Sequence, residues 1–460
     1  MNLISYRGPG VAGGVSSGLK QVFTAQSEHD SRWFFLSDEG DLSSLEADEE
    51  DAVTLAGIDE KIIEGHYRFC NEFIWPIMHD RFSYIRFSDA DYQYYRSFNA
   101  ALTAAIAAET HGHLAFVQDY QLALIPGLLS ARGYTSKMFW HIPWPETVPA
   151  KFLGVISELA KGMLATSVLG FHTEEYANNF MAFVADNLPQ FSVNTDRALV
   201  VGRSGFAPLA NRSCTEIIVQ SLGIDLEFWT DLAHNKSAGL PEELATESPL
   251  PMVLSVDRVD YTKAVFDRFE IIDRFFSEFP EWLGKIRFVQ LCSRSRKSLP
   301  TFDKYYRDCR SKYEEVNGRW ETATWQPILW LQNGVSPAGL AALYKHAAVM
   351  LVNPVRDGLN LTAEEFAACQ SLENPGVLLL SPGAGAWEEL GDDALEAHPA
   401  RKNQAIESIL EALQVPLEER SERMQNMQQK LCEHSSTHWW NRFAITTLPA
   451  KSSDMLRRAV

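Results

Sequence analysis

The sequence predicts an α/β protein with two doubly wound domains, each built on a parallel sheet covered by helices on both faces. Short apolar runs of strand length alternate with helical patterns along the chain, which is typical of parallel sheets. The runs form two series, separated by a polar stretch rich in proline and glycine between Asn235 and Pro251. At 460 residues the chain is also too long for one ordinary hydrophobic core.

Each series supplies five predicted strands. The first comprises Leu3–Ser5, Trp33–Leu36, Leu114–Val117, Met138–His141 and Val168–Phe171, and the second comprises Met252–Ser255, Ile286–Leu291, Ile328–Leu331, Val349–Val352 and Val377–Leu380. Helical patterns in the first series include residues 15–23, 95–110 and 150–163. We therefore expect an N-terminal domain over 1–235, a second domain over 236–435, and a C-terminal helix over 436–460 that packs back across the domains.

Composition narrows the class of protein. The net charge of -19 argues against a nucleic-acid partner. No apolar run reaches the length needed to cross a bilayer, and the first residues indicate a strand rather than a secretory signal. The six cysteines are scattered without a C-x-x-C pair, so neither a disulfide framework nor a zinc site is expected. A cytoplasmic protein fits these observations.

Polar and charged segments follow several predicted strands. In open parallel sheets, ligands bind beyond the carboxyl ends of the strands, and two such domains place the predicted site in the cleft between them. The segments concerned are residues 7–10 with 13–14, 118–120, 141–145, 257–263, 293–296 and 356–365.

The segment from Arg356 to Glu365 is the most informative of these. It follows an apolar strand and precedes a helix that opens at Thr362, so free backbone N–H groups and the helix dipole favour an anionic ligand there. Asp357 and Asn360 suit sugar hydroxyls, and Glu365 can reach a second polyol such as a ribose. One site therefore offers partners for phosphate, hexose and ribose, which are the parts of a sugar nucleotide.

Two other features allow alternative interpretations. Gly13 and Gly14 follow the first strand, where they permit close approach of a ligand to the backbone or form a plain tight turn. Arg258 and Lys263 follow the first strand of the second series. They suit the developing charge of a diphosphate leaving group, or they pair at the surface with neighbouring aspartates.

A series of ordered motifs makes the chain resemble a known family. The motifs are Trp75-Pro76 with His79 and Arg81, Asp119-Tyr120, residues 141–145, 170–174, 255–263, 356–365, 374–386, and His438-Trp439. With this order and spacing, from about residue 3 to residue 448, the chain resembles the trehalose-6-phosphate synthase family of retaining glycosyltransferases. The resemblance implies the GT-B fold, in which two Rossmann-like doubly wound domains face a cleft.

The resemblance also implies roles for individual residues. On the donor side it implies diphosphate binding by Arg258 and Lys263, sugar and phosphate binding by Gly14, Asp357, Gly358, Leu359, Asn360 and Leu361, and ribose binding by Glu365. It places Asp119 and His141 beside the reacting sugar. On the acceptor side it implies a phosphate clamp of Arg7 and Arg296, whose planar forks match phosphate oxygens, in a pocket with His66 and Trp75.

The implied reaction moves glucose from a nucleotide-diphosphate glucose to a phosphorylated acceptor, with glucose 6-phosphate giving trehalose 6-phosphate as the first expectation. Leu36 and His66 stand where the family usually carries tryptophan and tyrosine, although Tyr67 is adjacent. Related glucosylglycerol-phosphate synthases use glycerol 3-phosphate, and related pseudo-glycosyltransferases couple cyclitol phosphates, so both acceptors remain alternatives. A non-catalytic regulator that binds a sugar phosphate is a further alternative. The donor base and the oligomeric state are not fixed by the sequence.

The family is read as retaining without a covalent enzyme intermediate, and no residue here is singled out as a nucleophile, although Asp119 and Asp357 are not excluded. No cofactor or metal is expected. Asp89-Ala90-Asp91 also allows a metal site, but we interpret these carboxylates as charges at a helix N-terminus. His111-Gly112-His113 lacks a third ligand and is interpreted as a loop.

Overall fold

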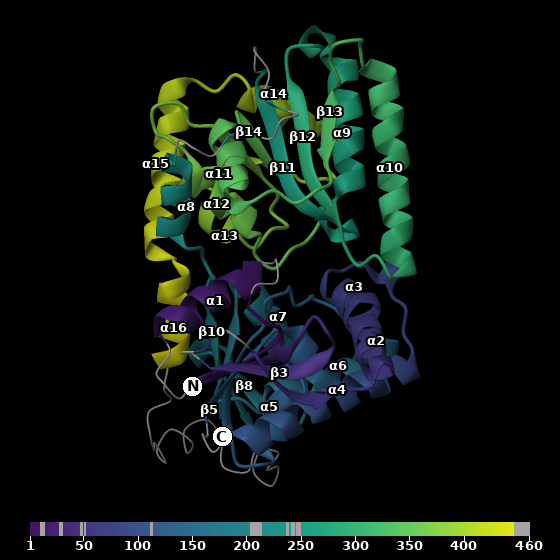
Figure 1. Ribbon diagram of the computed structural model, residues 1–460, viewed down its shortest axis with the longest axis vertical. Helices are drawn as coiled ribbons and strands as arrows, with labels where there is room; N and C mark the ends of the chain where they lie inside the picture. The colour runs from purple at the N-terminus through teal and green to yellow at the C-terminus, as the bar shows by residue number, and fades with distance from the viewer. Residues whose placement is uncertain are drawn as a thin grey trace. The chain divides into compact units, whose positions relative to one another are not determined.

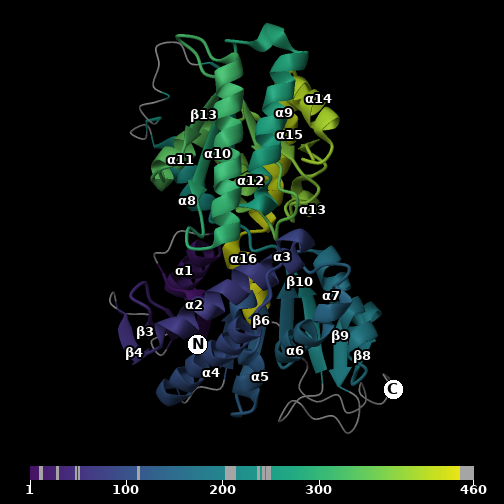
Figure 2. The ribbon, with the colours of Figure 1, turned by 90° about the vertical axis from the view of Figure 1, so that its right-hand side faces the viewer.

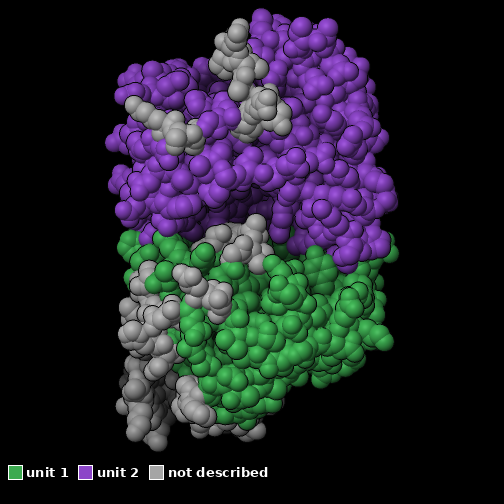
Figure 3. Space-filling model, in the orientation of Figure 1, with its two compact units in different colours: residues 1–222, 436–460 green, residues 223–435 purple. Residues whose placement is uncertain are grey.

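The structure, a computed structural model, describes residues 1–9, 14–26, 31–46, 49, 52–110, 114–202, 214–235, 239–240, 244 and 250–445. The chain forms two compact units, which Figure 3 colours separately. The first comprises residues 1–222 and 436–460, and the second comprises residues 223–435. Within the described part of the chain, no helix is long and apolar enough to span a membrane.

The first unit is built on a ten-stranded sheet with the order β4-β3-β2-β1-β5-β6-β7-β10-β9-β8. Its strands are β1 (Asn2–Arg7), β2 (Arg32–Leu36), β3 (Asp41–Glu46), β4 (Val53–Gly57), β5 (Leu114–Gln118), β6 (Thr135–Phe139), β7 (Val168–Phe171), β8 (Phe191–Asn194), β9 (Leu199–Gly202) and β10 (Cys214–Val219). The strands from β2 to β10 in this order are parallel, and antiparallel strands extend both edges. The chain order reverses at β1, between β2 and β5.

Helices cover the sheet of the first unit (Figures 1 and 2). They are α1 (Gly14–Gln26), α2 (Glu60–Arg68), α3 (Trp75–Met78), α4 (Asp89–Glu109), α5 (Ile125–Ser130), α6 (Leu153–Met163), α7 (Glu174–Asn187) and α16 (Ser436–Ile445). The helices α2, α4, α5, α6 and α7 pack in succession, whereas α16 packs against α1. Asp89 and Asp91 lie in the first turn of α4, where the Ser88 hydroxyl accepts a hydrogen bond from Asp91 N, which confirms their interpretation as helix-end charges.

The second unit has a six-stranded sheet, all parallel, with the order β13-β12-β11-β14-β15-β16. Its strands are β11 (Met252–Val259), β12 (Arg287–Arg294), β13 (Ile328–Leu331), β14 (Val349–Val352), β15 (Val377–Leu380) and β16 (Leu395–Glu396). The strand order reverses between β11 and β14. In such sheets the loops on either side of this switch point part at the carboxyl edge and leave room for a ligand.

Two layers of helices enclose this sheet (Figure 1). They are α8 (Leu226–His234), α9 (Val265–Glu278), α10 (Pro300–Trp320), α11 (Pro337–His346), α12 (Leu361–Cys369), α13 (Trp387–Leu390), α14 (Lys402–Ala412) and α15 (Leu417–Glu433). One layer contains α9, α10 and α14, and the other contains α8, α11, α12 and α15. Both faces of the sheet are therefore shielded from water, which explains why strands such as Val349–Val352 are apolar at every position.

The structure shows which residues each unit includes. Helix α8 packs on α11 and α12 in the second unit, so the chain passes from one unit to the other at residues 222–223. The predicted boundary after residue 235 rests instead on the proline- and glycine-rich stretch that begins there. Much of that stretch lies outside the described residues. At the other end, α16 packs on the first unit, where Trp440 contacts Phe116 at a centroid distance of 4.8 Å.

The predicted strands are all present, and the structure adds β3, β4, β8, β9 and β10 in the first unit. Four of these five belong to the antiparallel edges, where solvent exposure replaces the continuous apolar run with mixed residues. In β4, for example, Val53 is 54% exposed. His111–His113 and Gly13, which the sequence analysis considered, lie outside the described residues.

The docking of α16 depends on a buried lysine. Lys137 is 4% exposed, and its Nζ donates to Phe443 O at 3.0 Å and to Ala444 O at 2.5 Å, at the C-terminus of α16. Lys137→Met keeps an unbranched side chain that is only one atom shorter, but it leaves these carbonyls without their charged donor. We expect a loss of about 2 kcal/mol in the free energy of unfolding, measured by urea titration. The matched variant Lys61→Met, at an exposed position, is expected to change it by less than about 0.5 kcal/mol; an equal loss in both would contradict this role.

Candidate functional site

The carboxyl edge of the second sheet is organised around an ion pair between Lys263 and Asp357. Lys263 ends the turn after β11, and Asp357 lies in the loop after β14, so the pair joins the two sides of the switch point. Their side chains are 11% and 10% exposed. Water therefore screens this pair little, and each group holds the other in place at the edge of the sheet.

A second charged residue, Arg268, connects neighbouring strands of this sheet through hydrogen bonds. Arg268, on α9, is fully buried, and its guanidinium donates to Asp257 Oδ2 at 2.8 Å, Gln290 Oε1 at 3.1 Å and Asn353 Oδ1 at 2.7 Å. These acceptors belong to β11, β12 and the residue after β14. The same guanidinium donates to Lys263 O at 3.2 Å. Arg268 thus fixes the backbone that carries Lys263. Nothing in the sequence indicates this role, because an arginine within an amphipathic helix ordinarily faces solvent.

The loop after β15 closes the same edge. Asp357 N donates to Gly383 O, and Ala386 N donates to Leu359 O, each at 2.8 Å. Gly385 permits this approach, because a Cβ there would lie 2.1 Å from Gly358 O. The loops after β14 and β15 therefore act as one support for the start of α12.

Asn360 and Glu365 lie at the start of α12, which these two loops hold in place. Asn360 precedes α12 with φ of 79°, its Oδ1 accepts from the Thr362 hydroxyl at 2.6 Å, and its Nδ2 is buried with no hydrogen-bond partner among the described residues. One turn later, Glu365 Oε2 accepts from the Tyr344 hydroxyl at 2.8 Å. Burial raises the pKa of Glu365 to about 7, against the lowering effect of the Tyr344 hydrogen bond.

The two arginine candidates of the second unit differ in their surroundings. Arg258, near the end of β11, is exposed and makes no ion pair with the described residues. Arg296 has a side chain only 7% exposed, pairs with the buried Asp260 and lies over the Phe302 ring. Asp260 also accepts from Thr262 N and its hydroxyl, so Arg296 is linked to the turn that carries Lys263.

In the first unit, Asp119 follows β5 in a strained conformation. Its φ of 73° and ψ of 172° lie in a region that glycine alone adopts freely, at a cost of about 1–3 kcal/mol for other residues. Asp119 Oδ1 accepts from His141 N at 3.1 Å. Burial raises the pKa of Asp119 to about 7, and hydrogen bonds from the backbone of Tyr120 and His141 oppose that rise.

His141 is held at both ring nitrogens. Its Nε2 lies 2.9 Å from Gln118 Oε1, and its Nδ1 lies 3.2 Å from His172 Nε2. Because an amide oxygen only accepts, Nε2 of His141 carries the proton and Nδ1 accepts from His172. Burial and the neighbouring His172 lower the pKa of His141 well below its usual value. The ring is therefore neutral, and it positions the backbone N–H that binds Asp119.

The predicted acceptor residues of the first unit lie in different surroundings. Arg7 is partly exposed, 3.4 Å from Asp38 and over the Tyr6 ring. Trp75 is 5% exposed and packs on His79, with ring centroids 4.0 Å apart. His66 is fully buried in the core of the first unit, and its acceptor role stays a prediction. Arg7 and Arg296 belong to different units, and their joint phosphate clamp stays a prediction.

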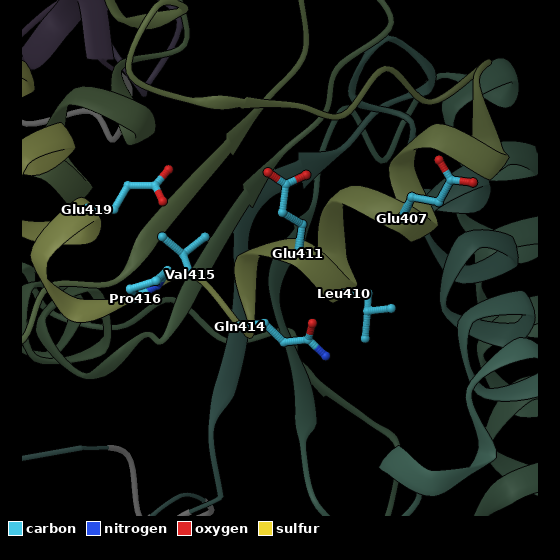
Figure 4. Close-up of a pocket in the computed structure, with 7 residues that line it drawn as sticks. All are labelled: Glu407, Leu410, Glu411, Gln414, Val415, Pro416 and Glu419. Atoms are coloured by element: carbon cyan, nitrogen blue, oxygen red, sulfur yellow. The ribbon is translucent and has the colours of Figure 1, made fainter.

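Gly14, the remaining donor candidate, is the first residue of α1. Among the described residues, no group of three histidine, cysteine or acidic side chains is arranged to hold a metal ion. A surface pocket of about 320 Å³ lies between α14 and α15, lined by Glu407, Leu410, Glu411, Gln414, Val415, Pro416 and Glu419 (Figure 4). Its acidic lining lies on two helices outside the loops described above and does not suit a phosphate.

Comparison with known proteins agrees with this architecture. The chain is similar to solved α,α-trehalose-phosphate synthases from Burkholderia vietnamiensis and from Burkholderia xenovorans, the latter in complex with glucose-6-phosphate. Each is 26% identical with a TM-score of 0.86, and the match covers 96% of this chain and 95% and 98% of theirs. The fold is thus that of a two-domain GT-B glycosyltransferase.

The chain matches glycosyltransferase family 20 over residues 20–447 and belongs to that family. It is 32% identical over 403 residues to a bifunctional trehalose-6-phosphate synthase/phosphatase of Thermoproteus tenax, covering 85% of this chain and 53% of the relative. It is 30% identical over 397 residues to the 56 kDa subunit of a UDP-forming α,α-trehalose-phosphate synthase of Kluyveromyces lactis, covering 84% and 79%. The chain spans about half the length of several curated relatives, with shares of 53%, 51% and 47%.

The strain at Asp119 has a measurable consequence for stability. Asp119→Gly and Asp119→Ala both remove the carboxylate, but only glycine accepts the observed φ and ψ without strain. We expect the glycine variant to be more stable than the alanine variant by about 1–2 kcal/mol in urea unfolding, after the larger backbone entropy of glycine is included. A more stable alanine variant would show that the turn is not strained.

The buried carboxyl of Glu365 makes stability depend on pH. Its folded-state pKa is raised from 4.5 to about 7, so between these values the folded chain holds a proton that the unfolded chain releases, and stability falls as pH rises. Glu365→Gln removes this effect and keeps an acceptor for Tyr344. Its stability relative to the wild type should therefore increase from pH 4.5 to pH 7 by about 3 kcal/mol, with no such trend for the exposed Glu373→Gln. Parallel pH curves for Glu365→Gln and the wild type would rule this out.

Proposed function

We propose that this chain is a retaining glucosyltransferase that moves glucose from UDP-glucose to glucose 6-phosphate, forming trehalose 6-phosphate and UDP. Membership of glycosyltransferase family 20 supports the reaction class, and relatives named as UDP-forming support the donor. A solved relative in complex with glucose-6-phosphate supports the acceptor. The observation that carries the proposal is the buried Lys263–Asp357 pair beside the start of α12, at the switch point of the second sheet.

The donor chemistry follows from these groups. When the bond between glucose C1 and the diphosphate oxygen breaks, negative charge grows on the departing phosphate. Lys263 and Arg258 supply positive charge at the end of β11, and the first amides of α12 point N–H groups at the same edge. As the donor binds, its phosphate replaces Asp357 as the partner of Lys263. The Asp357 carboxylate and the Asn360 amide are then available to sugar hydroxyls.

Retention is proposed without a covalent enzyme intermediate. The acceptor hydroxyl attacks C1 on the face that the diphosphate leaves, and an oxygen of the departing phosphate takes the hydroxyl proton. The protein then contributes orientation and charge stabilisation rather than a nucleophile. Asp119, whose direction is fixed by the His141 amide, is the candidate for orienting the reacting sugar.

No metal is required in this proposal, because the charge of the leaving group is taken up by Lys263, Arg258 and the start of α12. We expect activity to be the same, within about two-fold, in 1 mM EDTA and in 5 mM Mg²⁺. Loss of activity in EDTA that Mg²⁺ restores would contradict this part of the proposal.

The donor cations are tested by substitution. Arg258→Ala and Lys263→Ala are expected to lower kcat about 100-fold or more, because each removes a charge that acts on the leaving group in the transition state. Lys285→Ala removes an exposed lysine at the opposite, amino end of the same sheet and serves as the control. Near-normal kcat in both donor variants, measured by UDP release, would end the assignment.

The acceptor is tested by a panel in which UDP-, GDP- and ADP-glucose are each combined with glucose 6-phosphate, glycerol 3-phosphate and a cyclitol phosphate. The proposal requires the highest kcat/KM for UDP-glucose with glucose 6-phosphate. A preference for glycerol 3-phosphate would make the chain a glucosylglycerol-phosphate synthase. Binding of nucleotide sugar without release of nucleotide across the panel would favour a regulatory protein.

A further inference from the structure

The turn that carries Asp119 is held by side chains from two helices. After the strained Asp119, residues Tyr120–Leu122 form a single helical turn. The Tyr95 hydroxyl on α4 donates to Tyr120 O at 2.8 Å and accepts from Ala123 N at 3.0 Å. One hydroxyl therefore bridges both ends of the turn.

Two further side chains bind the carbonyl in the middle of the turn. Asn99 Nδ2, one helical turn after Tyr95, donates to Gln121 O at 3.1 Å, and His66 Nε2, on α2, lies 3.0 Å from the same oxygen. Since a carbonyl only accepts, His66 Nε2 carries the proton. Burial lowers the pKa of His66 to about 4, so the ring is neutral at physiological pH.

Aromatic rings enclose this cluster. The His66 ring stacks on Tyr6 and Tyr95, with centroids 5.0 Å and 5.2 Å apart, and lies 4.1 Å from the Phe98 ring. His66, Tyr95 and Asn99 are all fully buried. Hydrogen bonds in such a dry environment are electrostatically strong and fix the geometry of the groups that they join.

We propose that His66, Tyr95 and Asn99 are positioning residues that hold the turn after β5 in the strained conformation that aims the Asp119 carboxylate. This role in catalysis rests on the proposed function, in which Asp119 orients the reacting sugar. A strained residue persists only where its surroundings over-determine it, and here three buried side chains bind three backbone groups of the four residues that follow it. The acceptor role predicted for His66 stays a prediction, and the contacts of its buried ring support the turn behind Asp119.

The restraint is tested first by stability, without any substrate. Asp119→Gly relieves strain only while the cluster enforces the turn. In the otherwise wild-type chain, Asp119→Gly should have a higher Tm than Asp119→Ala, which also lacks the carboxylate, and in a Tyr95→Phe chain, where the turn is already free to relax, this gain should fall by at least half. The matched control is Tyr92→Phe, on the same helix. The hydroxyl that it removes donates to Glu158 Oε2 at 2.5 Å and not to the turn. In that background the gain should be unchanged. If Tyr95→Phe does not fold, Asn99→Ala is used in its place.

The catalytic consequence is tested by steady-state kinetics with UDP-glucose and glucose 6-phosphate. Tyr95→Phe and Asn99→Ala are expected to lower kcat by 10-fold or more while each KM stays within about two-fold, because the substrates still bind but Asp119 no longer points at the reacting sugar. Tyr92→Phe should stay within two-fold of the wild type in both parameters.

Either measurement can overturn the proposal. Equal gains in Tm of Asp119→Gly over Asp119→Ala in the wild-type, Tyr95→Phe and Asn99→Ala chains would show that the cluster does not enforce the turn. Equal losses of kcat in Tyr95→Phe and Tyr92→Phe would show a general structural effect. A wild-type chain with no transferase activity would refute the proposed function, and the stability comparison would then decide the restraint alone.

Discussion

The ion pair between Lys263 and Asp357 is the interaction on which the candidate donor site depends. It joins the turn after β11 to the loop after β14 across the switch point of a parallel sheet. Arg268 fixes the backbone on one side through Lys263 O, and the loop after β15 fixes the other side through Asp357 N. Both charged groups are therefore in place before a ligand arrives, which reduces the ordering that binding requires.

Much of this arrangement could be predicted from the sequence. Strands buried on both faces, such as Val349–Val352, are apolar at every position, and their alternation with helical patterns indicates parallel sheets. Because parallel strands end at one edge, residues that follow different strands, such as Lys263 and Asp357, are expected together without knowledge of their contacts. The motif around Asp357 further limited the ligand to one with phosphate and sugar groups.

The remaining features depend on contacts that one-dimensional patterns do not record. Arg268 and Tyr95 lie within helices, and they bind groups as far as 85 and 25 positions away along the chain, so the local pattern does not distinguish them from solvated or purely apolar positions. The edge strand β4 lacks the apolar alternation that marks a half-buried strand. His66 is the opposite case. Its place in the motif pattern indicated a ligand pocket, but its ring is enclosed by the rings of Tyr6, Tyr95 and Phe98.

Backbone amide hydrogen exchange measured by mass spectrometry is the sharpest test of the donor site, because we propose that backbone groups at the start of α12 bind phosphate. The protein is compared alone and with UDP, GDP and ADP. We expect UDP to slow exchange in peptides covering Gly358 to Ala363, and Lys263→Ala to reduce this protection. Exchange in that segment that none of the three nucleotides changes would contradict a diphosphate site beside the Lys263–Asp357 pair.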